Sequence, residues 1–388
     1  MHQHHNRLSR EGQPFSLLRE CPKREILLLV SVLIVLLQRS LRNRTELMRS
    51  LSESFVRPVH RFLAVLTGRL RFSVAEVLIL TAGAALLVWL AYSIVMLIRK
   101  PRKGRRLWRM LMTPASFGFA VYAGFCVLWG VYYYGDDFQE KSGLNTREVS
   151  VEELETVTVY FAAKANEYSA LVTRDAEGLY VTDRRAIIDR TPGLYRRAEE
   201  LYPILSGPEV PVKPFFFSRI LSLTDFSGFF FPFTAEANVN TDFPLSLFPA
   251  TAAHELAHQR GVAKEQEANF CAVLASLLDG DPEFCYSACL LAYTHLGNAL
   301  HSADPEAFRL VYDGLNENVL RDFAANREYW KRFETPIQEI SNTVYEGFLY
   351  SYDQNLGLKS YGACVDLLVC HYLDDAQQYF GMSETDGG

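Results

Sequence analysis

The feature that most constrains the fold of this chain is Val77–Ile98, a stretch of 22 residues without a charge. As a helix it is about 33 Å long, enough to cross the hydrocarbon core of a bilayer. A second uncharged stretch, Thr113–Gly135, ends in aromatic residues typical of a membrane-interface belt: Trp129, Tyr132, Tyr133 and Tyr134. The apolar run Ile26–Leu37 has only 12 residues, so it spans only with snorkelling Arg and Lys neighbours. We expect two or three transmembrane helices, at about 25–41, 74–98 and 114–134.

Charge is distributed unevenly along the chain. Residues 1–134 carry 20 Lys or Arg and 6 Asp or Glu, whereas residues 135–388 carry 19 and 39. The basic residues of the first part lie between apolar runs, which makes nucleic-acid binding a poor explanation for them. A basic, apolar first part followed by an acidic, aromatic-rich part predicts a membrane region at 1–134 and a soluble domain at 135–388.

Seven basic residues between two of these spans predict the topology: Arg99, Lys100, Arg102, Lys103, Arg105, Arg106 and Arg109. The positive-inside rule places them in the cytosol and the residues after Tyr134 outside. The basic segment Arg39–Arg71 argues the other way if the first apolar run also spans. We interpret that segment as an amphipathic element at the membrane interface. The expected location is the cell membrane, with several spans and an extracytoplasmic soluble domain.

The second part is predicted to be mainly helical, with a small β element. Apolar positions recur at helical spacing in Val151–Ala170. Pro, Phe, Gly and β-branched residues dominate 207–248, and we expect short strands in Val210–Phe217 and Phe229–Asn240. Helices are expected again from Pro249 onward, at about 250–260, 264–278, 283–301, 304–332, 334–355 and 360–379.

The first of these later helices carries a pattern with specific chemistry. Pro249 and Gly261 suit its start and end, and between them stand His254, Glu255 and His258 in the order HExxH. Two imidazoles four residues apart lie one turn apart on one helix face, so both can bind one metal ion. Glu255 is placed to touch a water that the metal activates. The pattern predicts a zinc site for hydrolysis with Glu255 as general base.

A zinc hydrolase site usually has a third protein ligand, and the next predicted helix offers two carboxylates. Glu265 shares a face with Asn269 and with small residues, which allows close packing against the HExxH helix. Glu267 shares a face with larger apolar residues. We choose Glu265 as the ligand, with Asn269 orienting an imidazole, and Glu267 remains the alternative.

HExxH followed by ExxxN resembles the gluzincin metallopeptidases, in which the first Glu after the motif binds zinc and the residue four positions later supports a histidine. The chain departs from the usual pattern in having Asn269 instead of Asp, and only six residues between His258 and Glu265. That short gap requires a sharp reversal, which Gly261 permits. More closely, "PFTAEANVN…FPATAAHELAHQRGVAKEQEANF" and the late "SYGACVDLL" resemble an uncharacterised family of bacterial membrane proteins of unknown function. The resemblance implies a bacterial origin and a mainly α, zincin-like domain.

The gluzincin resemblance implies two further features. In that group an edge strand before the active-site helix pairs with an extended peptide substrate. Glu236, Asn238 and Asn240 alternate onto one face of Phe229–Asn240, and we expect them to line that cleft. A His or Tyr from a later helix is also expected to stabilise the transition state, the candidates being His295, His301, His371, Tyr345 and Tyr352.

These features together predict a membrane-anchored zinc-dependent endopeptidase. Its expected partners are the lipid bilayer and a peptide or protein substrate, and no nucleic acid. The alternative is a non-catalytic zinc-binding membrane receptor or scaffold. Glu255 argues against that alternative, because a structural zinc site usually has four protein ligands and no use for an adjacent carboxylate. A transporter is disfavoured, since two or three spans without charged residues offer no pathway.

Overall fold

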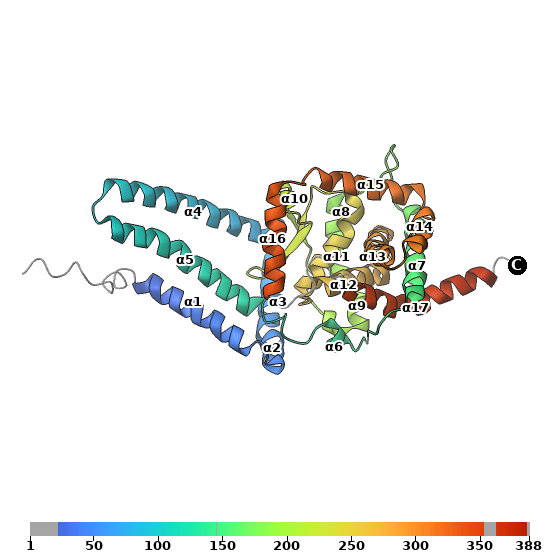
Figure 1. Ribbon diagram of the computed structural model, residues 1–388, viewed down its shortest axis with the longest axis horizontal. Helices are drawn as coiled ribbons and strands as arrows, with labels where there is room; N and C mark the ends of the chain where they lie inside the picture. The colour runs from blue at the N-terminus through green and yellow to red at the C-terminus, as the bar shows by residue number, and fades with distance from the viewer. Residues whose placement is uncertain (1–21, 145, 353–361, 386–388) are drawn as a thin grey trace, which may run out of the picture. The chain divides into compact units, whose positions relative to one another are not determined.

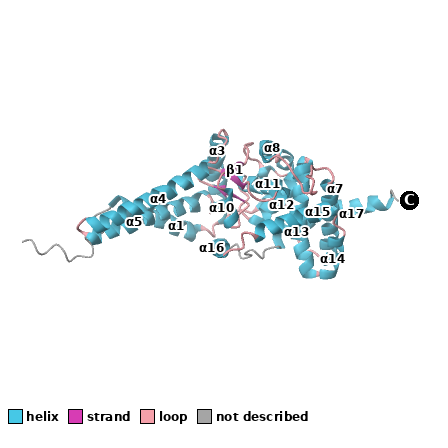
Figure 2. Ribbon diagram, turned by 90° about the horizontal axis from the view of Figure 1, so that it is seen from above, coloured by secondary structure: helices cyan, strands magenta, loops and turns pink. Residues whose placement is uncertain are grey.

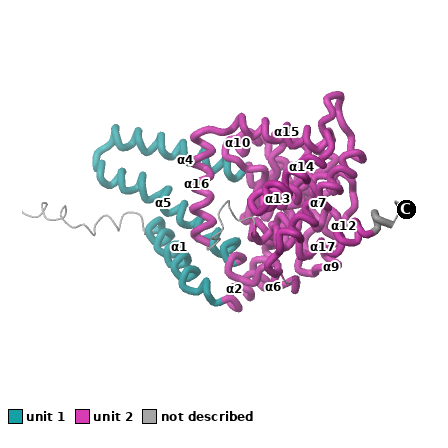
Figure 3. Tube along the Cα trace, turned by 45° about the vertical axis from the view of Figure 1, so that its right-hand side comes forward, with its two compact units in different colours: residues 1–44, 77–131 teal, residues 45–76, 132–388 magenta. Residues whose placement is uncertain are grey.

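The computed structural model describes residues 22–144, 146–352 and 362–385. Contacts divide the chain into two units, shown in Figure 3: unit 1 comprises residues 1–44 and 77–131, and unit 2 comprises 45–76 and 132–388. The fold is mainly helical with one small three-stranded sheet (Figures 1 and 2). This confirms the predicted fold class at that level. Residues 45–76, which the sequence suggested as part of the membrane region, belong to unit 2.

Unit 1 consists of helices with apolar surfaces. They are α1 (Pro22–Leu41), most of α4 (Val74–Arg99) and α5 (Lys103–Leu128). Among the described residues, α4 and α5 are the helices long and apolar enough to cross a membrane. α1 packs against α5, where the Ser116 hydroxyl donates a hydrogen bond to the Arg24 carbonyl at 2.9 Å. The length and composition of α4 and α5 support an association with a membrane.

The predicted aromatic belt at the end of α5 is wrong for two of its members. α5 ends at Leu128, and Tyr132 and Tyr133 are buried side chains of unit 2. The ring of Tyr132 stacks on His60 with centroids 6.1 Å apart, and the ring of Tyr133 lies 5.0 Å from that of Tyr352. The chain leaves the helix before these residues, so their rings pack inside the unit.

Unit 2 contains the small sheet and the remaining helices. The first predicted β segment contains β1 (Lys213–Phe215). The second, predicted as one strand, is divided into two antiparallel strands, β2 (Gly228–Phe231) and β3 (Glu236–Asn240). The helices are α2 (Thr45–Leu51), α3 (Arg57–Gly68), α6 (Phe138–Ser142), α7 (Val151–Ser169), α8 (Arg184–Arg190), α9 (Arg196–Leu201), α10 (Ser218–Leu223), α11 (Phe248–Gln259), α12 (Glu265–Asp279), α13 (Pro282–Ala303), α14 (Pro305–Asp313), α15 (Glu317–Lys331), α16 (Pro336–Ser351) and α17 (Gly362–Thr385). A π-helical turn, Ser52–Val56, joins α2 to α3.

The helices that follow the sheet agree with the sequence pattern, with one exception. The single helix predicted at 304–332 is divided into α14 and α15, because Asn316 caps the second one. Its side chain accepts a hydrogen bond from the Val319 N–H at 3.0 Å, which satisfies an otherwise unpaired amide of the first turn. Residues 353–355 of the predicted helix 334–355 lie outside the described residues.

The sheet has the order β1-β3-β2, with β1 parallel and β2 antiparallel to the central β3. α11, α12 and α13 pack on one another, and α7 packs on α13. Their interior faces form one apolar core, to which they contribute the large buried side chains Phe161, Phe248, Phe270 and Tyr286. Because β2 and β3 both contact α11, the sheet lies directly beside the HExxH helix.

Buried polar side chains of β3 hold the beginning of α4. The Glu236 carboxylate accepts hydrogen bonds from the N–H groups of Val74 at 3.0 Å and Ala75 at 2.7 Å. The Ser73 hydroxyl donates to Asn238 Oδ1 at 2.6 Å. A carboxylate at a helix N-terminus satisfies unpaired amides and interacts favourably with the helix dipole. β3 is therefore a structural strand that fixes residues 73–75 to the sheet.

Replacing Glu236 by Ala is expected to destabilise the protein by about 2 kcal/mol, because it leaves two buried N–H groups without an acceptor. Thermal unfolding of the purified protein in detergent measures the effect as a lowered Tm. Glu236→Gln is the matched control, since its amide keeps one acceptor oxygen and should lose clearly less. Equal Tm values for Glu236→Ala and the wild type would contradict the structural role.

Candidate metal centre

The HExxH residues occupy successive turns of α11. Pro249 lies in the first turn of this helix, and the rings of His254 and His258 lie on one face with centroids 4.7 Å apart. The chain reverses at Gly261, whose φ of 89° is a conformation that side chains with a Cβ rarely adopt. A Cβ there would also lie 2.9 Å from the Tyr132 ring. The reversal lets α12 begin at Glu265, alongside α11.

Three ligand atoms converge between these helices. Glu265 Oε2 lies 3.1 Å from His254 Nε2 and 3.6 Å from His258 Nε2. One ligand atom from each of the three side chains lies within 4.8 Å of the others. Atoms bound to zinc at 2.0–2.1 Å with tetrahedral angles are about 3.3 Å apart. The spacing of this trio therefore fits a single zinc ion.

Hydrogen bonds fix both imidazoles in the orientation that metal binding requires. His258 Nδ1 lies 2.7 Å from the Val262 carbonyl oxygen, which only accepts, so this nitrogen carries the proton. His254 Nδ1 lies 2.8 Å from Asn269 Oδ1, which holds the second ring in the same way. With a metal ion bound between the helices, both Nε2 atoms would direct a lone pair at it, beside Glu265 Oε2. Asn269 thus occupies the orienting position expected for it.

The alternative ligand Glu267 lies elsewhere. Its side chain is buried, and its Oε2 accepts a hydrogen bond from the Phe138 N–H at 3.0 Å, on the other side of α12 from the imidazoles. Burial raises the pKa of Glu267 to about 7. The structure brings only Glu265 of the two carboxylates to the histidines, and Glu267 instead ties α12 to the start of α6.

Glu255 is buried at the centre of this arrangement. Burial raises the pKa of its carboxyl to about 7, and its Oε2 has no hydrogen-bond partner among the described residues. β2 passes close to its other oxygen: a Cβ at Gly228 would lie 2.5 Å from Glu255 Oε1. Glycine is therefore required at this point of the strand. A buried carboxylate oxygen without a partner is costly in a protein interior and points to a ligand or a water that completes it.

Of the five residues proposed to stabilise a transition state, Tyr345 reaches the trio. Its hydroxyl, on α16, donates to Glu265 Oε1 at 2.8 Å, and burial beside that carboxylate raises the pKa of Tyr345. Burial, together with the electrostatic interaction with His254, lowers the pKa of His295 on α13 to about 4. The other three rings pack against aromatic neighbours, His301 on Phe308, His371 on Phe270 and Tyr352 on Tyr133.

The expectation that Glu236, Asn238 and Asn240 line a substrate cleft is wrong. β3 is the central strand, flanked by β1 and β2, and all three side chains are at most 1% exposed. Each is bonded inside the protein, Asn240 through its Nδ2 to the Ser222 hydroxyl at 2.9 Å. The alternation of the sequence placed the three on one face correctly, but that face is covered.

Comparison with known families identifies a family for this chain but no activity. The family model described as "Protein of unknown function (DUF3810)" matches residues 51–369. The chain belongs to this family. No curated protein and no solved structure matches it. The match supports the predicted resemblance to an uncharacterised family, and the relation to gluzincins stays a prediction.

A cavity of about 390 Å³ adjoins the trio of this DUF3810 protein. His254, Glu265 and Asn269 form one side of it. Most of the remaining lining is apolar: Phe243, Leu247, Ala250, Leu291 and Trp330. The sequence analysis did not identify these apolar residues. They come from the connection between β3 and α11, from α11, α13 and α15, and they share no local pattern.

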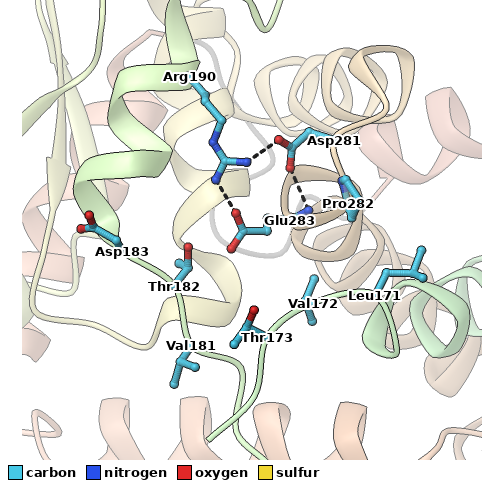
Figure 4. Close-up of a pocket in the computed structure, with 10 residues that line it drawn as sticks. All are labelled: Leu171, Val172, Thr173, Val181, Thr182, Asp183, Arg190, Asp281, Pro282 and Glu283. Atoms are coloured by element: carbon cyan, nitrogen blue, oxygen red, sulfur yellow. Dashed lines mark hydrogen bonds and ion pairs between the residues drawn. The ribbon is translucent and has the colours of Figure 1, made fainter.

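A second hollow, of about 590 Å³, lies where α13 begins (Figure 4). Figure 4 shows the Arg190 guanidinium directed at Asp281 and Glu283, and it forms ion pairs with both. These ion pairs occupy the Arg190 guanidinium, and we assign this hollow no function. The trio of His254, His258 and Glu265, with the cavity beside it, is the better candidate for a functional site.

Proposed function

We propose that this protein is a membrane-anchored zinc-dependent endopeptidase. The observation that carries the proposal is the convergence of His254, His258 and Glu265 on one point, with the buried carboxylate of Glu255 beside them. Three protein ligands leave one position for water or substrate, which distinguishes catalytic from structural zinc sites. The two Nε2 atoms and Glu265 Oε2 would hold the ion.

Zinc, when bound there, lowers the pKa of a water molecule and polarises a carbonyl group. Glu255 takes the proton of the attacking water and passes it to the leaving amine. Its carboxylate suits both steps by position, because an oxygen beside the trio can accept the proton of the water and donate it to the amine afterwards. Asn269 and the Val262 carbonyl keep the imidazoles in their metal-binding tautomer.

Two features support a peptide as the substrate. β2 is an outer strand of the sheet and runs past Glu255 at Gly228, so an extended peptide that pairs with its edge passes the catalytic carboxylate. The cavity beside His254, whose lining is partly apolar, would accept a hydrophobic side chain of that peptide. The strand proposed for this role is β2, at the start of the predicted strand Phe229–Asn240, whereas the residues first expected to line the cleft lie on β3.

The apolar helices α4 and α5 support the membrane anchor. The basic residues from Arg99 to Arg109, which include the start of α5, favour the cytosolic side for the connection between them. On this topology the residues after α5, and with them the metal trio, are extracytoplasmic.

Metal analysis and cleavage assays on the purified full-length chain test the proposal. We expect about one zinc ion per chain, cleavage of a peptide library, loss of cleavage after chelation and recovery on adding zinc. A purified wild-type protein that neither contains nor binds zinc would rule the proposal out.

Replacing Tyr345 by Phe is expected to lower kcat by about 100-fold, because its O–H, which bonds Glu265, reaches the trio and can stabilise negative charge that develops there. KM and zinc content should change little. Tyr350→Phe, an exposed position on the same helix, is the control and should retain full activity. An unchanged kcat for Tyr345→Phe would restrict Tyr345 to a hydrogen bond with the ligand Glu265.

A further inference from the structure

Large apolar side chains are exposed on unit 2 near the beginning of α4. Phe216 is 83% exposed, and its neighbours Phe217 and Ile220 are also on the surface. Isolated exposed apolar residues are common, but a cluster of large ones usually marks a surface that contacts something apolar. The question is what covers these rings.

The backbone of this cluster is bonded to the first turn of α4. The Glu76 carboxylate accepts hydrogen bonds from the N–H groups of Phe216 at 2.9 Å and Phe217 at 2.8 Å. Glu76 is buried and is the last charged residue before the uncharged stretch Val77–Ile98. The backbone at Phe216 and Phe217 is therefore bonded to the residue that directly precedes that stretch.

The same region is held rigidly by a second set of bonds. Lys213, a buried residue of β1, donates to the carbonyl groups of Gly68 and Leu70. Glu236 binds the Val74 and Ala75 amides, as described above. The segment that leads into α4 and the strand that leads to Phe216 are thus fixed to one another.

A second row of exposed apolar residues precedes α4. On α3, Phe62 and Leu66 lie one turn apart on the exposed face, and Ala64 and Thr67 face the interior. The Thr67 hydroxyl contacts the Thr234 carbonyl at 3.3 Å, which orients the helix. Leu70 and Phe72 continue the exposed row toward α4, interleaved with the exposed Arg69 and Arg71. Apolar rings with interspersed arginines suit a lipid interface with anionic headgroups.

We propose that the aromatic rim formed by Phe62, Leu66, Leu70, Phe72, Phe216 and Phe217 inserts into the headgroup and acyl boundary of the bilayer that α4 crosses. The inference rests on the proposed membrane anchor and is independent of catalysis. Lipid is the occupant that the observations favour, because Leu70 and Phe72 directly precede the membrane-length helix α4, and Glu76 in the first turn of α4 binds the amides of Phe216 and Phe217. The buried charge of Glu76 is tolerated at this depth because both its oxygens accept hydrogen bonds.

Photocrosslinking tests the rim in the full-length protein. p-Benzoylphenylalanine is placed singly at Phe216, Phe217 or Phe72, and the protein is reconstituted into vesicles of phosphatidylcholine and phosphatidylglycerol and irradiated. Mass spectrometry then measures the fraction of protein carrying a covalent lipid. The reference positions are Leu87 on α4, 69% exposed, and Leu310 on α14, 63% exposed.

We expect lipid adducts at Phe216 and Phe72 in yields close to that at Leu87 and at least tenfold above that at Leu310. Adducts at Leu87 but not at the rim positions would overturn the inference and leave the membrane anchor intact. Crosslinks from the rim to a protein chain instead of lipid would overturn it in favour of a protein interface. Absence of lipid at Leu87 as well would remove the membrane anchor itself, and the rim with it.

Discussion

Replacing Glu255 by Gln is expected to lower peptide hydrolysis by about 1000-fold while the zinc content stays near one ion per chain. The amide has the shape of the carboxyl, so it fits the narrow space beside Gly228, where a Cβ would already lie 2.5 Å from Oε1. It is not a base, and it cannot move a proton from water to the leaving amine. The measurements are kcat on a quenched fluorescent peptide and zinc by mass spectrometry.

Glu317→Gln serves as the matched control for this experiment. Glu317 is an exposed residue of α15 that pairs with Arg321, and its replacement should change neither activity nor metal content. Equal product profiles for the wild type and Glu255→Gln would argue against catalysis by this site and favour a zinc-binding receptor. Loss of zinc in Glu255→Gln would show that the carboxylate takes part in coordination.

Replacing Glu265 by Gln is expected to weaken zinc binding by more than about 100-fold, since even residues that only orient a ligand contribute 10- to 100-fold. The neutral amide is a poor substitute for the carboxylate oxygen that lies 3.1 Å and 3.6 Å from the two Nε2 atoms. Calorimetric titration of the metal-free protein with zinc measures the change. Activity should fall in parallel.

Glu267→Gln is the informative comparison, because the two residues lie two positions apart in the first turn of α12. Its bond from the Phe138 N–H can be made by an amide oxygen as well, so zinc binding should be unaffected. The reverse result, with zinc lost in Glu267→Gln and retained in Glu265→Gln, would mean that the ligand helix is rotated relative to the structure.

The parts of the candidate metal centre that the sequence predicts are the local ones. Histidines at i and i+4 share a helix face whatever surrounds the helix, and the choice of Glu265 over Glu267 followed from which side of the next helix carries small residues. Gly261 was expected at the reversal, and it has the positive φ that such a turn needs. Each of these inferences depends on spacing within 16 residues.

The parts that sequence reasoning missed depend on contacts between distant segments. Alternation along β3 indicates which side chains share a face, but not that β1 pairs with the strand from the other side and makes it central. Tyr345 is 80 residues from its partner Glu265, and nothing near either residue indicates the bond. The same applies to Gly228, whose requirement comes from the Glu255 oxygen.

The attachment of residues 73–76 to the sheet has a practical consequence for anyone who seeks a water-soluble form. The unit that carries the metal trio is discontinuous in sequence, so cutting the chain after residue 134 discards Ser73, Val74 and Ala75 and deprives Glu236 and Asn238 of their bonds. The logical excision is internal: residues 45–76 are joined by a flexible linker to residue 132, and the apolar segment 77–131 between them is removed.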